Sequence, residues 1–136
     1  MKIKMLILAL CSIVFFNSCT EDPISPIVPQ SYLASAFSLS DGRIWTVGAY
    51  GSIYYSTNFG KTFVKQNSNT SNILLSIIVN GNYGIITAEK GVVLISRDAG
   101  LTWKVSSPGT IKYLKSACFE NGVTYVSGQE SSFFVF

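Results

Sequence analysis

The chain of 136 residues contains no histidine and only two arginines, and charged residues make up 12% of it. The missing histidine excludes histidine-based metal sites and histidine general bases. The low charge, about half the usual share of a soluble domain, indicates that much of the chain is buried or associated with a membrane. Removal of Lys2 and Lys4 with an N-terminal leader would leave eight basic and seven acidic residues. No basic stripe remains, so we expect no nucleic-acid partner.

Cysteine is equally scarce. Cys11 lies within an apolar leader, Cys19 lies at its end, and Cys118 is the only cysteine in the rest of the chain. A single remaining thiol cannot form an internal disulfide. We expect Cys118, in an inner strand, to be a small buried hydrophobic residue. We expect no metal and no cofactor.

The first nineteen residues predict an export signal and an anchor. A basic start followed by the apolar run Leu6–Phe16 is typical of a signal peptide, and the run is too short to cross the roughly 30 Å hydrocarbon layer. The ending Phe16-Asn17-Ser18-Cys19 resembles the lipobox of bacterial lipoproteins. The resemblance implies that residues 1–18 are removed and that Cys19 carries the acyl chains that hold the protein at a membrane. An ordinary secreted protein cut nearby is the alternative.

The residues after Cys19 indicate where the anchor would lie. Thr20 rather than Asp follows the cysteine, which by resemblance to the sorting rule of Gram-negative lipoproteins favours the outer membrane. Glu21-Asp22 resembles the acidic tag of some surface-exported lipoproteins, so surface exposure is an added expectation. Three prolines at a spacing of three follow in EDPISPIVPQS, and they favour an extended backbone. We interpret 19–31 as the lipidated cysteine with a proline-rich tether, and 32–136 as the folded part.

The folded part repeats itself. A shift of forty residues places 34–63 on 74–103 without a gap, and a third, partial copy begins at Leu114. The predicted repeats are therefore 34–73, 74–113 and 114–136. The dipeptide Asp41-Gly42 falls on Gly81-Asn82 and on Asn121-Gly122, and such dipeptides suit two-residue hairpin turns.

Each full copy predicts four short strands. The predicted strands are 34–39, 43–47, 52–55 and 62–66 in the first copy, and 74–79, 83–88, 92–95 and 102–106 in the second. Four strands per forty residues is the arithmetic of a propeller blade. The fold prediction is all-β: an incomplete β-propeller of two four-stranded blades plus three strands of a third.

The most specific motif lies between the third and fourth strands of each copy. The pattern S-x-D-x-G-x-T-W is matched by Ser96, Asp98, Gly100, Thr102 and Trp103, and with two changes by Ser56, Asn58, Gly60, Thr62 and Phe63. Its chemistry is that of a turn, because Asp or Asn accepts hydrogen bonds from nearby amides and Gly tolerates positive φ. We expect the aromatic residue to fill the gap under the hairpin. The pattern resembles the BNR (Asp-box) repeat proteins, which include sialidases and the photosystem II assembly and stability factors.

The resemblance to sialidases implies a hydrolase, but the residues argue against one. Sialidases hold the substrate carboxylate with three arginines, and this chain has only Arg43 and Arg97. Glycoside hydrolysis needs two carboxyls at a set separation. The available carboxyls, which turns and loops would hold for structural reasons, are Asp41, Glu89, Asp98, Glu120 and Glu130. We therefore expect no catalytic residues, and a structural role for Asp98.

The loops between the second and third strands offer a candidate binding rim. Its residues are Tyr50, Glu89, Lys90 and Glu130, which would line one end of a propeller. Other aromatic residues might suggest sugar stacking, but their places inside strands favour the core: Trp45, Tyr54, Tyr55, Tyr83 and Tyr113.

The sequence therefore predicts a non-catalytic cell-envelope lipoprotein that presents a propeller scaffold for binding a protein or a glycan, or for assembly. The alternative is a truncated piece of a sialidase-like glycan hydrolase without its catalytic residues. A third hypothesis, an assembly factor, rests on family analogy alone.

Two and a half blades do not close a ring of four to eight, and they leave two blade faces and one strand edge open. We favour a fragment of a longer propeller as the explanation. Self-association through the open blade faces, or a small open stack of sheets, is the other explanation.

Overall fold

The structure is a computed structural model that describes residues 32–136. The predicted leader (1–18) and the lipidated cysteine with its tether (19–31) lie outside the described residues. The described part contains three antiparallel sheets of four, four and three strands. Its helical content is two short 3-10 turns, η1 (Ala49–Gly51) and η2 (Glu89–Gly91). No helix among residues 32–136 has the length and the apolar character that a membrane span requires.

Each sheet is a meander in which consecutive strands are neighbours, and we call the three sheets blades 1, 2 and 3. Blade 1 contains β1 (Leu33–Ser38), β2 (Ile44–Gly48), β3 (Ile53–Ser56) and β4 (Val64–Gln66). Blade 2 contains β5 (Leu74–Asn80), β6 (Tyr83–Ala88), β7 (Val93–Ser96) and β8 (Lys104–Ser106). Blade 3 contains β9 (Leu114–Glu120), β10 (Val123–Gly128) and β11 (Phe133–Val135). The predicted all-β fold, with two four-stranded sheets and three strands of a third, is confirmed.

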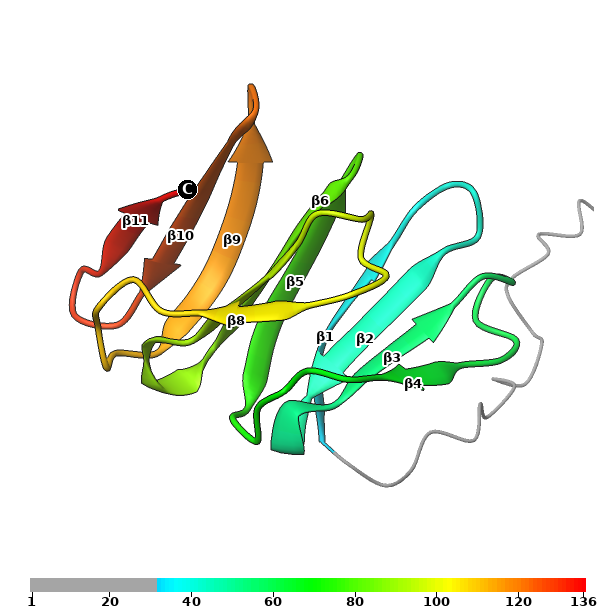
Figure 1. Ribbon diagram of the computed structural model, residues 1–136, viewed down its shortest axis with the longest axis horizontal. Helices are drawn as coiled ribbons and strands as arrows, with labels where there is room; N and C mark the ends of the chain where they lie inside the picture. Colours follow the sequence, from blue (N-terminus) through cyan, green and yellow to red (C-terminus); the bar gives the residue numbers. More distant parts are fainter. Residues whose placement is uncertain (1–31) are drawn as a thin grey trace, which may run out of the picture.

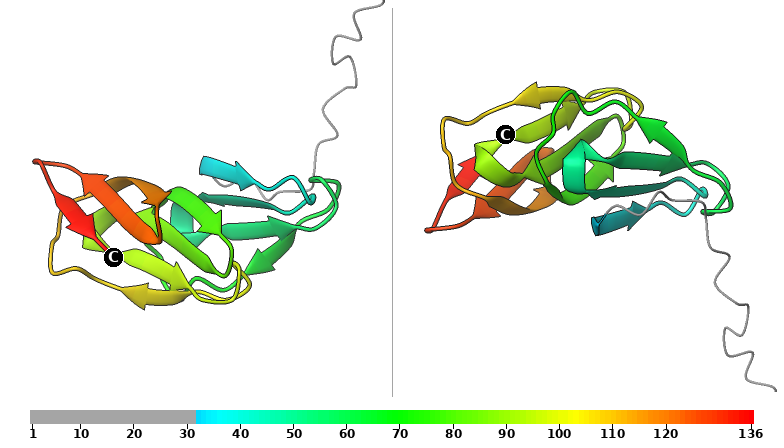
Figure 2. Two further views of the ribbon diagram at one scale, coloured as in Figure 1. Left: turned by 90° about the horizontal axis from the view of Figure 1, so that it is seen from above. Right: turned by 90° about the horizontal axis from the view of Figure 1, so that it is seen from below.

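The blades stand in a row and share one orientation (Figure 1). The first strand of each blade packs beside the first strand of the next, so β5 lies between β1 and β9. The loops β1–β2, β5–β6 and β9–β10 all point to one end of the molecule, which we call the hairpin end. The two 3-10 turns lie at the opposite end, which we call the connector end because the links between blades also pass there. Seen from above and below, the sheets stack face to face as neighbouring layers (Figure 2).

Apolar side chains fill the space between blades 1 and 2. Blade 1 contributes Trp45, Val47 and Ile53, all fully buried, and blade 2 contributes Leu74, Ile77, Val79, Ile86, Ala88, Leu94 and Trp103. The period-2 alternation of a strand explains this division, because alternate residues of β6 face opposite neighbours. Each large side chain that becomes fully buried contributes about 1.5–3 kcal/mol. This contact is therefore the main source of stability in the described part.

A second, smaller cluster joins blades 2 and 3. Its fully or almost fully buried members are Ile85, Val93, Leu114 and Val126. Ile78, Ile95, Ala117, Phe134 and Phe136 pack against it but remain partly exposed. The cluster is smaller because blade 3 covers less of its neighbour than blade 2 does.

The hairpin loops differ between blades. In blades 2 and 3, Asn80 pairs with Tyr83 and Glu120 pairs with Val123, so each loop has the two residues that the sequence predicts. In blade 1 the loop is longer, because Leu39 donates its amide to the carbonyl of Arg43. A turn from Leu39 to Gly42 follows, with Gly42 at φ 91°. The prediction of a two-residue turn at Asp41-Gly42 is therefore wrong, and this is a three-residue loop of the type that adds one residue to a hairpin.

The extra loop residue shifts β1 by one position against β2. Phe37 lies opposite Trp45, whereas forty residues later Ile78, not Ile77, lies opposite Ile85. A shift of one residue turns every side chain of a strand to the other face. Phe37 therefore packs toward blade 2, and the exposed Ala36 and Ser38 face away from it. The gapless repeat of the sequence does not extend to the pairing of β1.

Cys118 is exposed, so the prediction that it is buried is wrong. It lies on the inner strand β9, as expected, but strand alternation places it opposite Tyr125 on the face of blade 3 that points away from blade 2. Its counterpart forty residues earlier, Ile78, is covered by blade 3. No described residue covers blade 3 in the same way.

Two glycines allow consecutive blades to come close at the connector end. The amide of Gly51 donates to the carbonyl of Asn72 (2.9 Å), and that of Gly91 donates to the carbonyl of Lys112 (2.8 Å). Both glycines have positive φ. A Cβ atom at Gly51 would lie 2.0 Å from the carbonyl oxygen of Thr70. Only glycine fits this approach.

We expect Gly51→Ala to destabilise the fold much more than Gly81→Ala. Both glycines have positive φ, but nothing lies within 4 Å of a Cβ built at Gly81. The Gly81 variant should lose about 1 kcal/mol through backbone strain alone. The Gly51 variant should lose at least ~2 kcal/mol more, because the connector must move away. Urea unfolding followed by tryptophan fluorescence measures both, and equal losses would contradict the close approach of the blades.

Candidate functional site

Two turns with the same hydrogen bonds lie at the hairpin end, between β3 and β4 and between β7 and β8. We call 56–63 the first turn and 96–103 the second turn. In the second turn, Ser96 Oγ accepts from the amides of Asp98 (3.3 Å) and Gly100 (2.9 Å), and Asp98 Oδ1 accepts from the amide of Thr102 (2.9 Å). The first turn has the same bonds, forty residues earlier, at 3.2, 3.0 and 3.0 Å. One hydroxyl and one side-chain oxygen thus fix each turn.

The two turns differ in one hydrogen bond. Thr102 Oγ1 donates to Asp98 Oδ2 (2.5 Å), whereas Asn58 Nδ2 donates to Thr62 Oγ1 (2.9 Å). The threonine hydroxyl can serve in either direction. The turn therefore tolerates an amide in place of the carboxylate, but only the second turn carries a charge.

The hydrogen bonds also change the acidity of the second turn. The hydroxyl and the amide of Thr102, with a smaller contribution from Ser96, lower the pKa of Asp98 to about 2. Its carboxyl is therefore ionised at neutral pH and has no proton to donate. This electrostatic environment suits a structural acceptor and not a general acid.

Residue conformations in the turns follow from their shape. Phe59 and Gly60 both have positive φ, as do Ala99 and Gly100. The amides of Phe59 and Ala99 donate to the carbonyls of Gly42 and Asn82, which attaches each turn to the hairpin loop of its own blade. Because the turns extend to residues 63 and 103, β4 and β8 begin two residues later than predicted.

The aromatic residue that ends each turn packs under the hairpin. A Cβ atom at Gly84 would lie 2.9 Å from the ring of Trp103, so the tryptophan uses the space that the glycine leaves. In blade 1 the same two columns hold Ile44 and the smaller Phe63. The blades thus exchange volume between the two positions.

The second turn also binds blade 1. Trp45 Nε1 and Gln66 Nε2 donate to the carbonyl of Gly100 (3.1 and 3.0 Å), and Trp103 Nε1 donates to Gln66 Oε1 (3.0 Å). The sequence analysis missed Gln66. No repeat signal marks it, because Ser106 occupies its column in blade 2.

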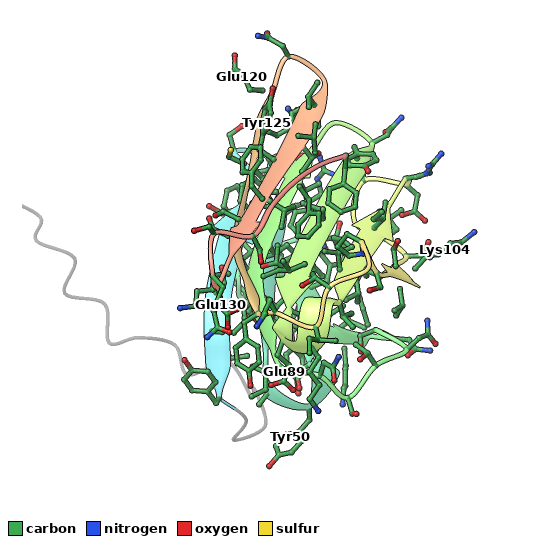
Figure 3. All side chains as sticks on the ribbon, turned by 90° about the vertical axis from the view of Figure 1, so that its left-hand side faces the viewer. Tyr50, Glu89, Lys104, Glu120, Tyr125 and Glu130 are labelled. Atoms are coloured by element: carbon green, nitrogen blue, oxygen red, sulfur yellow. The ribbon has the colours of Figure 1, made fainter. Side chains whose placement is uncertain are left out.

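The connector end presents the predicted binding rim. Tyr50, Lys90 and Glu130 occupy the same position in three consecutive blades, and all have positive φ (55°, 57° and 52°). Their side chains are exposed, Tyr50 by 81%. Figure 3 shows Tyr50 and Glu130 at this end, with Tyr50 extending furthest from the body. An aromatic ring, a cation and an anion thus follow one another along the row of blades.

Glu89, the fourth predicted rim residue, is engaged in the framework. It is half-buried, and its Oε1 accepts from the amide of Ile73 (3.2 Å) in the link between blades 1 and 2. Gln129 occupies the same column in blade 3 and faces the amide of Tyr113 (3.5 Å). At the rim itself, Glu130 forms an ion pair with Lys112 (2.5 Å).

A polar hollow of about 430 Å³ adjoins Tyr50. Its lining residues, which come from η1, β4 and the link to blade 2, are Tyr50, Gly51, Lys65, Gln66, Asn67, Ser68 and Thr70. Hydroxyl, amide and ammonium groups beside an exposed aromatic ring form a surface that can accept and donate hydrogen bonds. Lys65 extends the rim, and the sequence analysis missed it.

The carboxylates of the described part do not form a catalytic pair. Asp41 accepts from the side chain of Arg43 (2.8 Å), and the amide of Arg43 lowers the pKa of Asp41. Arg43 in turn lies over the ring of Trp45. Within residues 32–136, no three His, Cys, Asp or Glu residues are grouped as a metal site would require.

The aromatic residues that might bind sugars lie mainly in the packing. Trp45 and Tyr54 are buried, Tyr55 and Tyr83 are half-buried, and Tyr113 is 39% exposed. Tyr55 stacks on Trp45 at 4.8 Å between ring centroids. This agrees with the core interpretation of these strand residues.

The three sheets define the chain as part of a β-propeller. YCF48 from Cyanidioschyzon merolae is a solved structure with a similar fold, at a TM-score of 0.66 and 17% sequence identity. The similarity covers 80% of this chain and 38% of the YCF48 chain, and at this identity it shows the fold alone. No protein-family model and no curated protein sequence matches the chain.

We expect Asp98 to make stability depend on pH. Its pKa is lowered by folding, so its contribution is complete above about pH 4 and is lost as the pH falls toward 2. Asp98→Asn should remove this loss, because the first turn folds with Asn58 in the same place. The reciprocal Asn58→Asp should add a similar loss.

Urea unfolding between pH 5 and pH 2 measures the effect as the difference from the unchanged protein at each pH. Because Asp98 is almost fully exposed, solvent screens its interactions and the difference should be small. A pH profile that is identical in all three proteins would contradict the role of the carboxylate in the turn.

Proposed function

We propose that this protein is a non-catalytic scaffold that binds a protein or glycan partner at the connector end of its blades. The observation that carries the proposal is the row formed by Tyr50, Lys90 and Glu130. Three different chemistries stand at one repeated position, at the tips of short turns whose ends are fixed by backbone hydrogen bonds. A framework that keeps such groups in a fixed order suits recognition of one mixed polar surface.

The backbone at these positions supports the proposal. A residue other than glycine in the left-handed region costs of order 1 kcal/mol, and such strain is concentrated at functional sites. Tyr50 and Lys90 have this cost although glycine would relieve it, and Tyr50 exposes most of its ring to solvent. The side chains, rather than the turn alone, give a reason for these residues.

We further propose that the scaffold is an Asp-box propeller lipoprotein of the cell envelope. The hydrogen bonds of the first and second turns support the Asp-box assignment, since each motif residue has the turn role that its chemistry requires. The sequence at Cys19 supports the anchor. A lipid anchor and a tether would place the rim within reach of partners on the membrane surface.

Site-specific photo-crosslinking tests the rim. A benzophenone amino acid at Tyr50 should give a discrete adduct in intact cells, and the added changes Lys90→Ala and Glu130→Ala should weaken it at least several-fold. Phe59 is the matched control, because it is also an exposed aromatic residue with positive φ (70% exposed, 57°) but lies in the first turn. The same adducts from both positions, or none from Tyr50, would refute the rim, and turnover of a sialoside by the purified protein would refute a non-catalytic role.

Cys19→Ser tests the anchor. Loss of the thiol should remove acylation and move the protein from the membrane fraction to the soluble fraction. Cys11→Ser is the control, since Cys11 lies within the leader and should not affect either result. Mass spectrometry of the mature N-terminus and membrane fractionation measure the outcome. Unchanged fractionation of the Cys19 variant would leave the ordinary secreted protein as the better interpretation.

A further inference from the structure

The outer strands of blade 1 form a seat for the second turn of blade 2. Trp45 and Gln66 bind the carbonyl of Gly100, and Gln66 also binds the indole of Trp103. The fit is close, because a Cβ atom at Gly100 would lie 2.9 Å from the ring of Trp45. Packing between these blades therefore depends on a turn with an aromatic residue, followed by a fourth strand.

The same place on blade 2 is a hollow of about 530 Å³. Its lining residues come from β7, β8 and the second turn: Ile95, Arg97, Asp98, Thr102, Lys104, Val105 and Ser106. Ile95 and Ser106 are the residues forty positions after Tyr55 and Gln66 in blade 1. The hollow is thus the counterpart of the seat, and Ile95 also borders the cluster that contains Phe134 and Phe136.

Beside the hollow, blade 3 has a free strand edge. Phe136 and Thr124 exchange backbone hydrogen bonds (2.9 and 3.0 Å), and Phe134 pairs with Val126. By the alternation of an antiparallel ladder, the amides and carbonyls of Phe133 and Val135 point away from β10. In blades 1 and 2 the equivalent residues pair with β4 and β8. Phe133 and Val135 are 62% and 60% exposed.

We propose that the edge of β11 and the hollow on blade 2 form one binding site for an extended protein segment. The segment pairs with β11 as a fourth strand of blade 3, and an aromatic residue just before that strand enters the hollow. Strand addition supplies affinity through the main chain, and the hollow supplies selectivity. The partner chemistry is that of the chain's own residues 96–106, a tight turn with an aromatic residue followed by a short strand. This site is separate from the rim, so it does not depend on the proposed function.

The probe is a fluorescent peptide of residues 96–106, SRDAGLTWKVS, titrated with the full-length protein and followed by fluorescence anisotropy. Saturable binding is expected. A peptide with alanine in place of its tryptophan should bind at least about tenfold more weakly, because a buried aromatic anchor dominates such contacts.

Three variants of the protein locate the site. Ser106→Gln supplies the side chain that binds the indole in blade 1, so it should tighten binding about fivefold, as one or two added neutral hydrogen bonds would. Val135→Pro removes the amide that faces the peptide and should weaken binding about fivefold, while Val135→Thr keeps the amide and should bind normally. Proline is tolerated on an edge strand, and an unchanged near-ultraviolet circular dichroism spectrum checks that the variant folds.

Three results would overturn the proposal. One is the absence of saturable binding by the folded protein at millimolar concentration. Another is binding that neither the tryptophan nor the amide of Val135 affects. The third is a dimer, detected by light scattering, that the Val135→Pro change dissociates and that excludes the peptide, because a second copy would then occupy the edge.

Discussion

The contact between the ring of Trp45 and the backbone of Gly100 holds the described fold together. It brings the second turn of blade 2 onto the outer strands of blade 1, and the apolar residues between the two sheets can then close around it. Glycine is required there by distance and by its positive φ, and the indole satisfies the carbonyl that the approach would otherwise bury without a partner. The turn therefore has two roles: it ends a hairpin within its own blade, and it is the part of that blade that the preceding blade binds.

Much of this arrangement follows from the sequence. The period of forty residues, the strand alternation and the motif at 96–103 predict the sheets and their order, because local turn chemistry and burial agree there. The serine, the aspartate or asparagine, the glycine and the threonine all have short-range roles, so their spacing alone indicates their geometry. Gln66 could not be found in this way. Its partners lie 34–37 residues away, and its own column contains serine in the next blade.

The two errors of sequence reasoning share a physical cause. Both Cys118 and the hairpin at Asp41-Gly42 were assigned by analogy between columns, and a column does not specify its surroundings. One added residue in a loop changes the strand pairing of blade 1 while the sequence alignment stays intact. Likewise Ile78 and Cys118 share a position, but only the former has a neighbouring sheet against it. Repeats determine the unit well and the context of each unit poorly, because burial depends on the neighbour that stacks on it.

The three-residue loop of blade 1 gives the stack a direction. It turns Phe37 inward and leaves Ala36 and Ser38 on the outer surface of β1, where two small side chains offer little area to another sheet. At the opposite side of the row, blade 3 presents Tyr125 and Phe133, which stack on each other at 6.0 Å between ring centroids. Added repeats in an engineered array would accordingly find a favourable surface beyond blade 3 and a poor one before blade 1. A single glycine-containing loop, with no change in the strands themselves, is enough to make the two ends of the array unequal.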